Sequence, residues 1–400
     1  MRKTILALVL VSVLVGAALY ANLYVVQMLN PTLGDDPALW GKRYPLEYES
    51  YLRNHQGIAQ PYGGSVLISK LENHPEALIL YSGTGFSVDF NSSRGHTYSL
   101  KDVMATARPR PGGVCLTCKS AAVPRLMEQM GEEEFFRADF ASVSSLAAHP
   151  VGCANCHRSE DMSLTITNPA LLRGLEQLGK DTMQLLRQDM KTLVCAQCHV
   201  EYYFAKPDLK LTLPWNGGTD PEAIEEYYTG IGFVDWTHPD LGVGLVKVQH
   251  PEYETFAESV HHRLGLGCAD CHMPKMTAGN LRYTSHWWTS PLNHLQESCL
   301  YCHNTSPGEF RQRVLQIQQT IAQERSEVGE SLAALFRRVA VLSAISSYDR
   351  ALVVSYLVQA HFRWDWVFSE NSTGFHNFEL TKRLLREARD YIEKAERILD

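Results

Sequence analysis

The C-terminal part of the chain shows the clearest periodic pattern of apolar positions. In residues 309–343 apolar side chains recur at steps of three, four or seven, which places them on one stripe of a helix. Residues 349–368 are densely apolar and aromatic, as in a buried helix, and residues 378–399 return to helical spacing. Three helices with little turn chemistry between them predict an antiparallel bundle. The bundle either covers the rest of the protein or offers one stripe as a dimer seam.

The preceding segments show a different pattern. Residues 61–310 are rich in Gly and Pro and have few long periodic segments, which predicts short helices and loops. Residues 28–60 are polar and punctuated by proline, so we expect a linker that leads into irregular structure. Together with the C-terminal helices, this pattern predicts a mainly α protein.

The N-terminus begins Met1-Arg2-Lys3, and then no charged residue occurs before Asp35. A positive start followed by an apolar run is typical of an export signal. The run is also long enough to span a bilayer, although a small-x-small cleavage site occurs at residues 18–21. We favour an uncleaved anchor over a cleaved signal for residues 1–27. In either case the rest of the chain crosses the membrane.

All ten cysteines lie in Cys-x-x-Cys pairs, each followed by histidine or, once, by lysine. The five motifs are Cys115–Cys118 with Lys119, Cys153–Cys156 with His157, Cys195–Cys198 with His199, Cys268–Cys271 with His272, and Cys299–Cys302 with His303. Cys-x-x-Cys-His is the attachment signature of c-type haem, in which the histidine is the proximal iron ligand. A zinc site would not require histidine after each second cysteine. A disulfide framework would leave the regular spacing unexplained.

Five haems in 400 residues change the expected domain organisation. The cofactors would form much of the core, so we expect one haem-packed region over residues 28–308, followed by the helical region 309–400. The net charge is −7 and the chain has no basic tract, which argues against a nucleic-acid partner.

The lysine motif marks one iron as chemically different from the others. An iron with histidine on both faces can only pass electrons, whereas an iron with an open face can bind a substrate. The Lys119 amine binds a metal only in its unprotonated form. The Lys119 haem is therefore the candidate reaction centre.

Several further segments make a family resemblance specific. They are Arg94-Gly-His96, Cys-Leu-Thr-Cys-Lys-Ser, Val-Cys-Ala-Gln-Cys-His-Val-Glu201-Tyr202-Tyr203-Phe, Lys247-Val-Gln249-His250-Pro-Glu-Tyr-Glu-Thr, and Cys-Ala-Asp-Cys-His-Met-Pro-Lys. From about Trp40 to about His376, the chain resembles the ammonia-forming cytochrome c nitrite reductases, pentahaem enzymes whose catalytic haem carries lysine. The resemblance implies a multihaem cytochrome c fold, with short helices and loops around five haems and a C-terminal bundle of long helices.

The resemblance also implies the catalytic residues. Matching positions are Arg108, Tyr202 and His250, which would surround the Lys119 haem. Arg108 and His250 would hold the oxygens of nitrite by charge-assisted hydrogen bonds, and Tyr202 would donate a hydrogen bond or a proton. Arg110 is a rival to Arg108, because the segment before the first motif is short and rich in proline.

A calcium ion beside this pocket is a second implication. The matching ligands are the side chains of Glu201 and Gln249 and the main-chain carbonyls of Tyr202 and Lys247. All of these are oxygen donors, as calcium prefers.

Distal haem ligands follow from the same resemblance. The matching histidines are His96, His261, His286 and His376, one for each histidine motif. His262 adjoins His261, and either could be the ligand.

The implied activity is the six-electron reduction of nitrite to ammonium, with four bis-histidine haems relaying electrons. The implied partners are a second copy of the chain and a redox donor, either a quinol-oxidising membrane cytochrome or a small multihaem carrier. The implied location is the periplasm or the outer face of the cytoplasmic membrane. Two alternatives stay open: an electron-transfer cytochrome without a substrate site, and a related reductase of sulfite or hydroxylamine.

Overall fold

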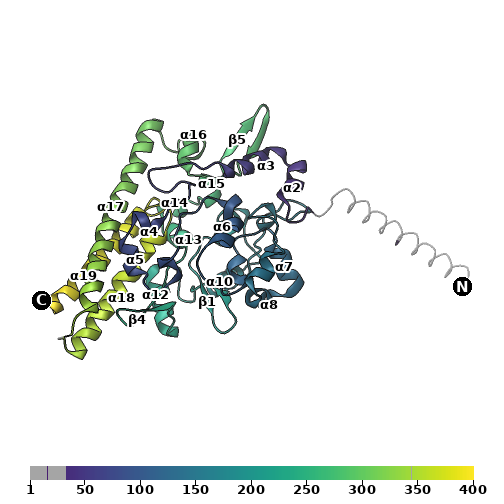
Figure 1. Cartoon of the computed structure of the whole chain (residues 1–400). Helices are drawn as coiled ribbons and strands as arrows, with labels where there is room; N and C mark the ends of the chain where they lie inside the picture. The colour runs from purple at the N-terminus through teal and green to yellow at the C-terminus, as the bar shows by residue number, and fades with distance from the viewer. Residues whose placement is uncertain (1–15, 17–32, 344) are drawn as a thin grey trace, which may run out of the picture.

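Three long helices form one side of the molecule in the computed structural model, which describes residue 16, residues 33–343 and residues 345–400. They are α17 (Pro307–Ala340), α18 (Ser347–Ser369) and α19 (Phe378–Leu399). Each contacts the other two, and Figure 1 shows them packed side by side. The predicted C-terminal bundle is therefore confirmed.

The start of α17 shows how local sequence sets a helix boundary. Ser306 Oγ accepts a hydrogen bond from the Glu309 N–H, and Glu309 Oε2 accepts one from the Ser306 N–H, both at 3.2 Å. Pro307 occupies the first turn, where the missing N–H of proline costs nothing. This capping box starts the helix at Pro307 rather than at residue 309.

Short helices and turns make up most of the rest of the chain, as predicted. The helices are α2 (Pro37–Arg43), α3 (Pro45–Leu52), α4 (Lys70–Asn73), α5 (Glu76–Leu80), α6 (Ser99–Ala105), α7 (Val123–Met130), α8 (Glu132–Arg137), α9 (Phe140–Ser144), α10 (Pro169–Gln177), α11 (Arg187–Ala196), α12 (Pro221–Ile231), α13 (Glu252–Ala257), α14 (Val260–Arg263), α15 (Cys268–His272) and α16 (Leu295–Ser298). Single 3-10 turns include η4 (Gly113–Leu116) and η5 (Cys153–Asn155).

The expectation of a linker over residues 28–60 is wrong for the part that is described, because α2 and α3 lie there. Pro37 and Pro45 each occupy the first turn of a helix, and Asp36 Oδ1 accepts a hydrogen bond from the Ala38 N–H at 2.8 Å. Proline starts a helix as readily as it interrupts one. Its presence alone therefore did not distinguish a linker from helix starts.

Three two-stranded antiparallel hairpins, which the sequence pattern did not indicate, connect some of the helices. They are β1 (Tyr203–Ala205) with β2 (Lys210–Thr212), β3 (Trp236–His238) with β4 (Val243–Leu245), and β5 (Lys275–Ala278) with β6 (Leu281–Thr284). The registers pair Tyr203 with Thr212 and Trp236 with Leu245. These two hairpins matter for the site, because Tyr202 precedes β1 and His250 follows β4.

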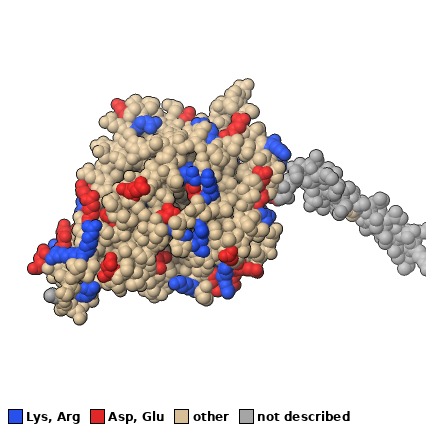
Figure 2. Space-filling model, in the orientation of Figure 1, with Lys and Arg blue, Asp and Glu red and all other residues tan. Residues whose placement is uncertain are grey.

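The buried apolar side chains form two main clusters. The larger joins α17, α18 and α19 to α5, α10 and α12, and it includes Trp364 and Trp366. The second surrounds the first Cys-x-x-Cys motif and includes Leu116, which is fully buried. The lysine motif therefore has a packed apolar support of its own. On the face seen in Figure 2, Lys and Arg side chains border a central hollow.

The predicted signal or anchor, residues 1–27, lies outside the described residues except for Gly16. Within the part of the chain that the structure covers, no helix is both long enough and apolar enough to cross a bilayer.

Candidate haem and catalytic sites

Four of the Cys-x-x-Cys motifs lie on short turns or at helix ends, and the fourth motif forms the short helix α15. None of the ten cysteines forms a disulfide. In the second, third and fifth motifs the histidine N–H bonds to the carbonyl of the first cysteine, at 2.9–3.0 Å. The Lys119 N–H instead bonds to the Leu116 carbonyl at 2.8 Å, so the lysine motif has a tighter turn.

The structure brings the eight predicted axial histidines together in pairs. The ring-centroid separations are 6.1 Å for His157 with His286, 6.3 Å for His303 with His261, 6.2 Å for His272 with His376, and 6.0 Å for His199 with His96. Each pair joins a motif histidine to a predicted distal histidine.

These separations suit a metal between two imidazoles. Two metal–nitrogen bonds of about 2.0 Å, together with the ring radii, put the two ring centres about 6 Å apart. Ordinary aromatic contacts cover the same range, so the distance alone does not decide between them. The hydrogen bonds of the other ring nitrogen, Nδ1, help to distinguish a metal-binding pair from an ordinary aromatic contact.

In several pairs Nδ1 lies against a backbone carbonyl or a carboxylate. His157, His272 and His286 contact the carbonyls of Met162, Thr289 and Thr284 at 2.9, 3.1 and 2.9 Å. His376 Nδ1 lies 2.7 Å from Glu370 Oε1. A metal-binding imidazole is usually oriented in this way, which leaves Nε2 for the metal. The residues present therefore fit bis-histidine haem.

His261 and His262 differ in their neighbours. The His261 ring lies 6.3 Å from His303, whereas the His262 ring packs against Phe256 at 5.5 Å. The geometry favours His261 as the partner of the fifth motif.

The third motif has two candidate partners. The His250 ring lies 6.4 Å from His199, only slightly farther than the 6.0 Å of His96. Nδ1 of both rings is buried without a hydrogen-bond partner among the described residues. Distance alone favours His96 by a small margin.

Neighbouring motifs lie close enough to interact. The Cys198 thiol lowers the pKa of the Cys118 thiol, and the Cys195 thiol raises the pKa of the Cys268 thiol. Helix α15, which carries the fourth motif, contacts both α11 and α16. The first, third, fourth and fifth motifs therefore follow one another in space, as an electron relay requires.

Lys119 lies near the predicted catalytic residues. Its charge and those of Arg108 and Arg110 all act on the Cys115 thiol, and the Arg108 charge also acts on Tyr202. Lys119 further acts on His250. The four residues come from three segments of the sequence, residues 108–119 and the loops that carry Tyr202 and His250, and the fold brings these segments close to the first motif.

The structure distinguishes Arg108 from Arg110. The Arg110 Nη1 donates to the carbonyls of Val103, Met104 and Thr106 at 3.2, 3.1 and 2.8 Å, so this guanidinium caps the end of α6. The Arg108 side chain has only a 3.4 Å contact from Nε to Thr106 Oγ1, and it stacks on Phe86. Arg108 is therefore the one available to bind an anion.

Burial controls the protonation of the two other catalytic candidates. It raises the pKa of the Tyr202 phenol above the ordinary value, so the phenol keeps its proton. It lowers the pKa of His250 to about 3, so the imidazole is uncharged at neutral pH. A hydrogen bond from this neutral ring to nitrite would still be charge-assisted, because the acceptor is an anion.

The predicted calcium ligands also come together. Glu201 is fully buried, and its carboxylate accepts from the Tyr228 hydroxyl at 2.8 Å and from the Gln249 N–H at 2.5 Å. The Gln249 side chain lies 2.9 Å from the Lys247 carbonyl. No group of three or more His, Cys, Asp or Glu side chains in the described part could hold a metal. The predicted site thus depends on one carboxylate with amide and carbonyl oxygens.

The burial of Glu201 is consistent with a cation at this place. Burial raises the pKa of Glu201 well above its ordinary value, and Glu254 adds to this effect. The nearby Lys247 ammonium instead binds Asp365 at 2.8 Å. A buried carboxylate without a cationic partner is costly, so the donor set fits calcium.

Asp365 is a residue that sequence reasoning missed. Its carboxylate accepts from the Lys247 ammonium, from the Val248 N–H at 2.9 Å and from the Tyr81 hydroxyl at 2.5 Å. It thereby ties the loop before His250 to α18 and α5. In the sequence it is one acidic residue inside a buried aromatic helix, with no local signal of this role.

Comparisons with known proteins agree with this arrangement. The sequence profile of the cytochrome c552 family matches residues 36–400. Cytochrome c-552 of Parabacteroides distasonis is 35% identical over 370 residues, covering 88% of this chain and 74% of the relative. Cytochrome c-552 of Desulfotalea psychrophila is 36% identical over 379 residues, covering 89% and 73%. The catalytic subunit of cytochrome c nitrite reductase from Desulfovibrio desulfuricans, described with two calcium sites, has a TM-score of 0.84 and 30% identity, covering 90% of this chain and 85% of that one.

Proposed function

The chain belongs to the cytochrome c552 family, and on this premise we propose that it is a multihaem cytochrome c nitrite reductase that forms ammonium at a lysine-ligated haem. An asymmetry between the motifs carries the proposal. Each histidine motif faces a second imidazole, whereas the first motif carries Lys119 and lies close enough to Arg108, Tyr202 and His250 for their charges to interact.

The ten cysteines would hold five haems, and Lys119 and the four imidazole pairs would bind the irons. Bound haem supplies iron that accepts and passes single electrons. The protein's own part is to bind the anion, orient it and deliver protons.

Arg108 would bind the oxygens of nitrite with its permanent positive charge. The neutral His250 imidazole would donate an N–H to the same anion, and the Tyr202 hydroxyl would hold a proton available for transfer. The segment of η4 that precedes Lys119 is buried in the second apolar cluster, which limits water on that side. These groups would stabilise negative charge as the N–O bonds break.

We predict that Arg108→Gln lowers kcat/KM for nitrite about 10²–10³-fold, the cost of losing one preorganised donor. Arg110→Gln is the matched control. It should leave kcat/KM close to that of the parent protein and lower the thermal midpoint, because Arg110 caps α6. Steady-state rates and thermal unfolding separate the two effects. The reverse ranking would assign anion binding to Arg110.

Calcium would hold together the two loops that carry Tyr202 and His250. The ligands proposed are the side chains of Glu201 and Gln249 and the carbonyls of Tyr202 and Lys247. The positive charge would also compensate the buried Glu201 carboxylate.

Removal of calcium by a chelator should lower the thermal midpoint and the nitrite turnover, and added calcium should restore both. Calcium at 100 times its dissociation constant would stabilise the folded protein by about 2.7 kcal/mol. Glu201→Gln should abolish the response, whereas Glu226→Gln, an exposed carboxylate on α12, should retain it. Identical responses in both variants would contradict the assignment.

The cellular arrangement proposed follows from the N-terminal pattern and the resemblance. The protein would be exported and held at the outer face of the cytoplasmic membrane by residues 1–27. It would receive electrons from a quinol-oxidising membrane cytochrome or a small multihaem carrier, and it would form a homodimer through the C-terminal helices. Sedimentation of the purified protein tests the dimer.

The deciding experiment is the ammonium yield from nitrite with reduced methyl viologen, on protein whose haem content has been counted. Five haems and nearly stoichiometric ammonium support the proposal. Five haems without nitrite consumption would mean an electron-transfer cytochrome whose Lys119 iron carries a sixth ligand. If sulfite or hydroxylamine were reduced faster than nitrite, that compound would be the substrate in place of nitrite.

A further inference from the structure

A cavity of about 860 Å³ lies between α14, α17 and α19. His261 and His303, the imidazoles of one pair, both line it. Phe310, Val314 and Ile317 of α17 form an apolar wall. A cavity with two facing imidazoles and an apolar wall suits the haem attached at the fifth motif.

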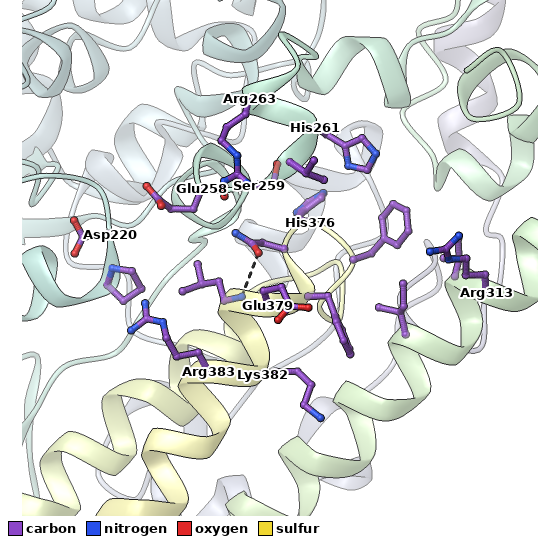
Figure 3. A pocket seen from close by; sticks show the side chains of 18 of the residues that line it. Asp220, Glu258, Ser259, His261, Arg263, Arg313, His376, Glu379, Lys382 and Arg383 are labelled. Atoms are coloured by element: carbon purple, nitrogen blue, oxygen red, sulfur yellow. Dashed lines mark hydrogen bonds between the residues drawn. The ribbon is translucent and has the colours of Figure 1, made fainter. Parts of the chain in front are cut away.

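Charged side chains of both signs line this cavity. It is lined by five cationic residues and three carboxylates, which are Arg263, Arg313, Lys382, Arg383, Arg386, Asp220, Glu258 and Glu379. Figure 3 shows Arg313 on one helix and Lys382 with Arg383 on another, around the space near His261 and His376. A haem carries two propionate carboxylates, which need cationic or polar partners.

Three of the five cations already have partners. Lys382 Nζ binds Glu324 at 2.7 Å, Arg383 binds Glu222 and Glu387, and Arg263 Nη1 donates to the Glu258 carbonyl at 2.6 Å. Neither Arg313 nor Arg386 forms an ion pair or a side-chain hydrogen bond with any described residue. These two arginines lie on different helices, α17 and α19, and both face the same cavity.

We propose that Arg313 and Arg386 bind the two propionate carboxylates of the haem attached at Cys302 and Cys299. The assignment rests on the proposed function, because it requires a haem on the fifth motif. Arginine suits this role, since its planar fork matches a carboxylate bidentately.

The two guanidinium groups also affect the electron relay. Reduction adds a negative charge to the iron, and a nearby positive charge that compensates the propionates stabilises the reduced form. Arg313 and Arg386 therefore raise the reduction potential of this haem relative to the others. At equilibrium, an electron would then reside on the haem of the fifth motif more often than on the others.

The test is a potentiometric titration of the purified holoprotein, followed by the EPR signals of the low-spin haems. In Arg313→Gln and in Arg386→Gln, one low-spin transition should shift to lower potential while the others stay in place, and the double variant should shift it further. Arg313→Lys, which keeps the charge, should shift it less. Arg389→Gln is the control, because Arg389 is on the same helix but binds Glu327 and does not line the cavity.

A haem count on each protein separates a failure of the propionate assignment from a failure of the proposed function. Five haems with unshifted potentials in both single variants would overturn the propionate assignment and leave the proposed function intact. An equal shift in Arg389→Gln would also overturn it, because the effect would be one of general surface charge. A parent protein without haem on the fifth motif would overturn both.

Discussion

Replacing Lys119 with alanine is expected to lower nitrite turnover at least about a hundredfold, while the four low-spin bis-histidine signals remain. Loss of a residue that merely orients a metal ligand already costs about 10–100-fold, and loss of the ligand itself should cost more. The other four motifs keep both of their imidazoles, so their haems should be unaffected.

Three measurements check this expectation: haem content, EPR spectra and turnover with reduced methyl viologen. Lys101→Ala, an exposed lysine on α6, controls for loss of a positive charge near the site. Lys119→His restores the ordinary motif, so it should retain five haems and show that low activity does not come from failed attachment. Unchanged turnover in Lys119→Ala would remove Lys119 from the reaction centre.

Substitution of His250 and of His96 should have different effects, although the two rings lie at nearly equal distances from His199. His250→Gln should lower turnover about 10²–10³-fold, as expected when one group that stabilises the developing charge is lost. It should leave the number of low-spin haems unchanged. His96→Gln should convert one low-spin haem to high spin, because the third motif loses its distal ligand.

EPR spectra of the two variants and the parent protein, recorded at equal haem content, separate these roles. His55→Gln provides a control at an exposed histidine. A new high-spin signal in His250→Gln rather than in His96→Gln would make His250 the distal ligand. The catalytic role would then pass to Arg108 and Tyr202 alone.

Asp365 shows how the position of His250 depends on residues outside the pocket. One buried carboxylate binds the Lys247 ammonium, the Val248 N–H and the Tyr81 hydroxyl. The loop that carries His250 is thereby tied to the C-terminal bundle. This gives the bundle a role in the site in addition to covering the haem region.

The sequence by itself determined the features that depend on neighbouring residues. Each Cys-x-x-Cys motif and its following histidine or lysine are contiguous, so haem attachment and the proximal ligand are local properties. The helix over residues 378–399 has the same bounds in the structure, because its apolar spacing is regular. Prolines were less informative. Pro37 and Pro45 each start a helix in a segment that the sequence pattern had suggested was a linker.

Only the tertiary structure decided which histidines face each other. His157 belongs to the second motif and its partner His286 lies beyond the fourth, and no periodicity connects the two positions. The resemblance pointed to Arg108 and left Arg110 as a rival, and the structure separates them, because the Arg110 guanidinium caps the end of α6. Which histidines pair, and which arginine is left available to bind an anion, depends on packing between distant segments. A one-dimensional pattern records which groups are present, and the fold determines which of them meet.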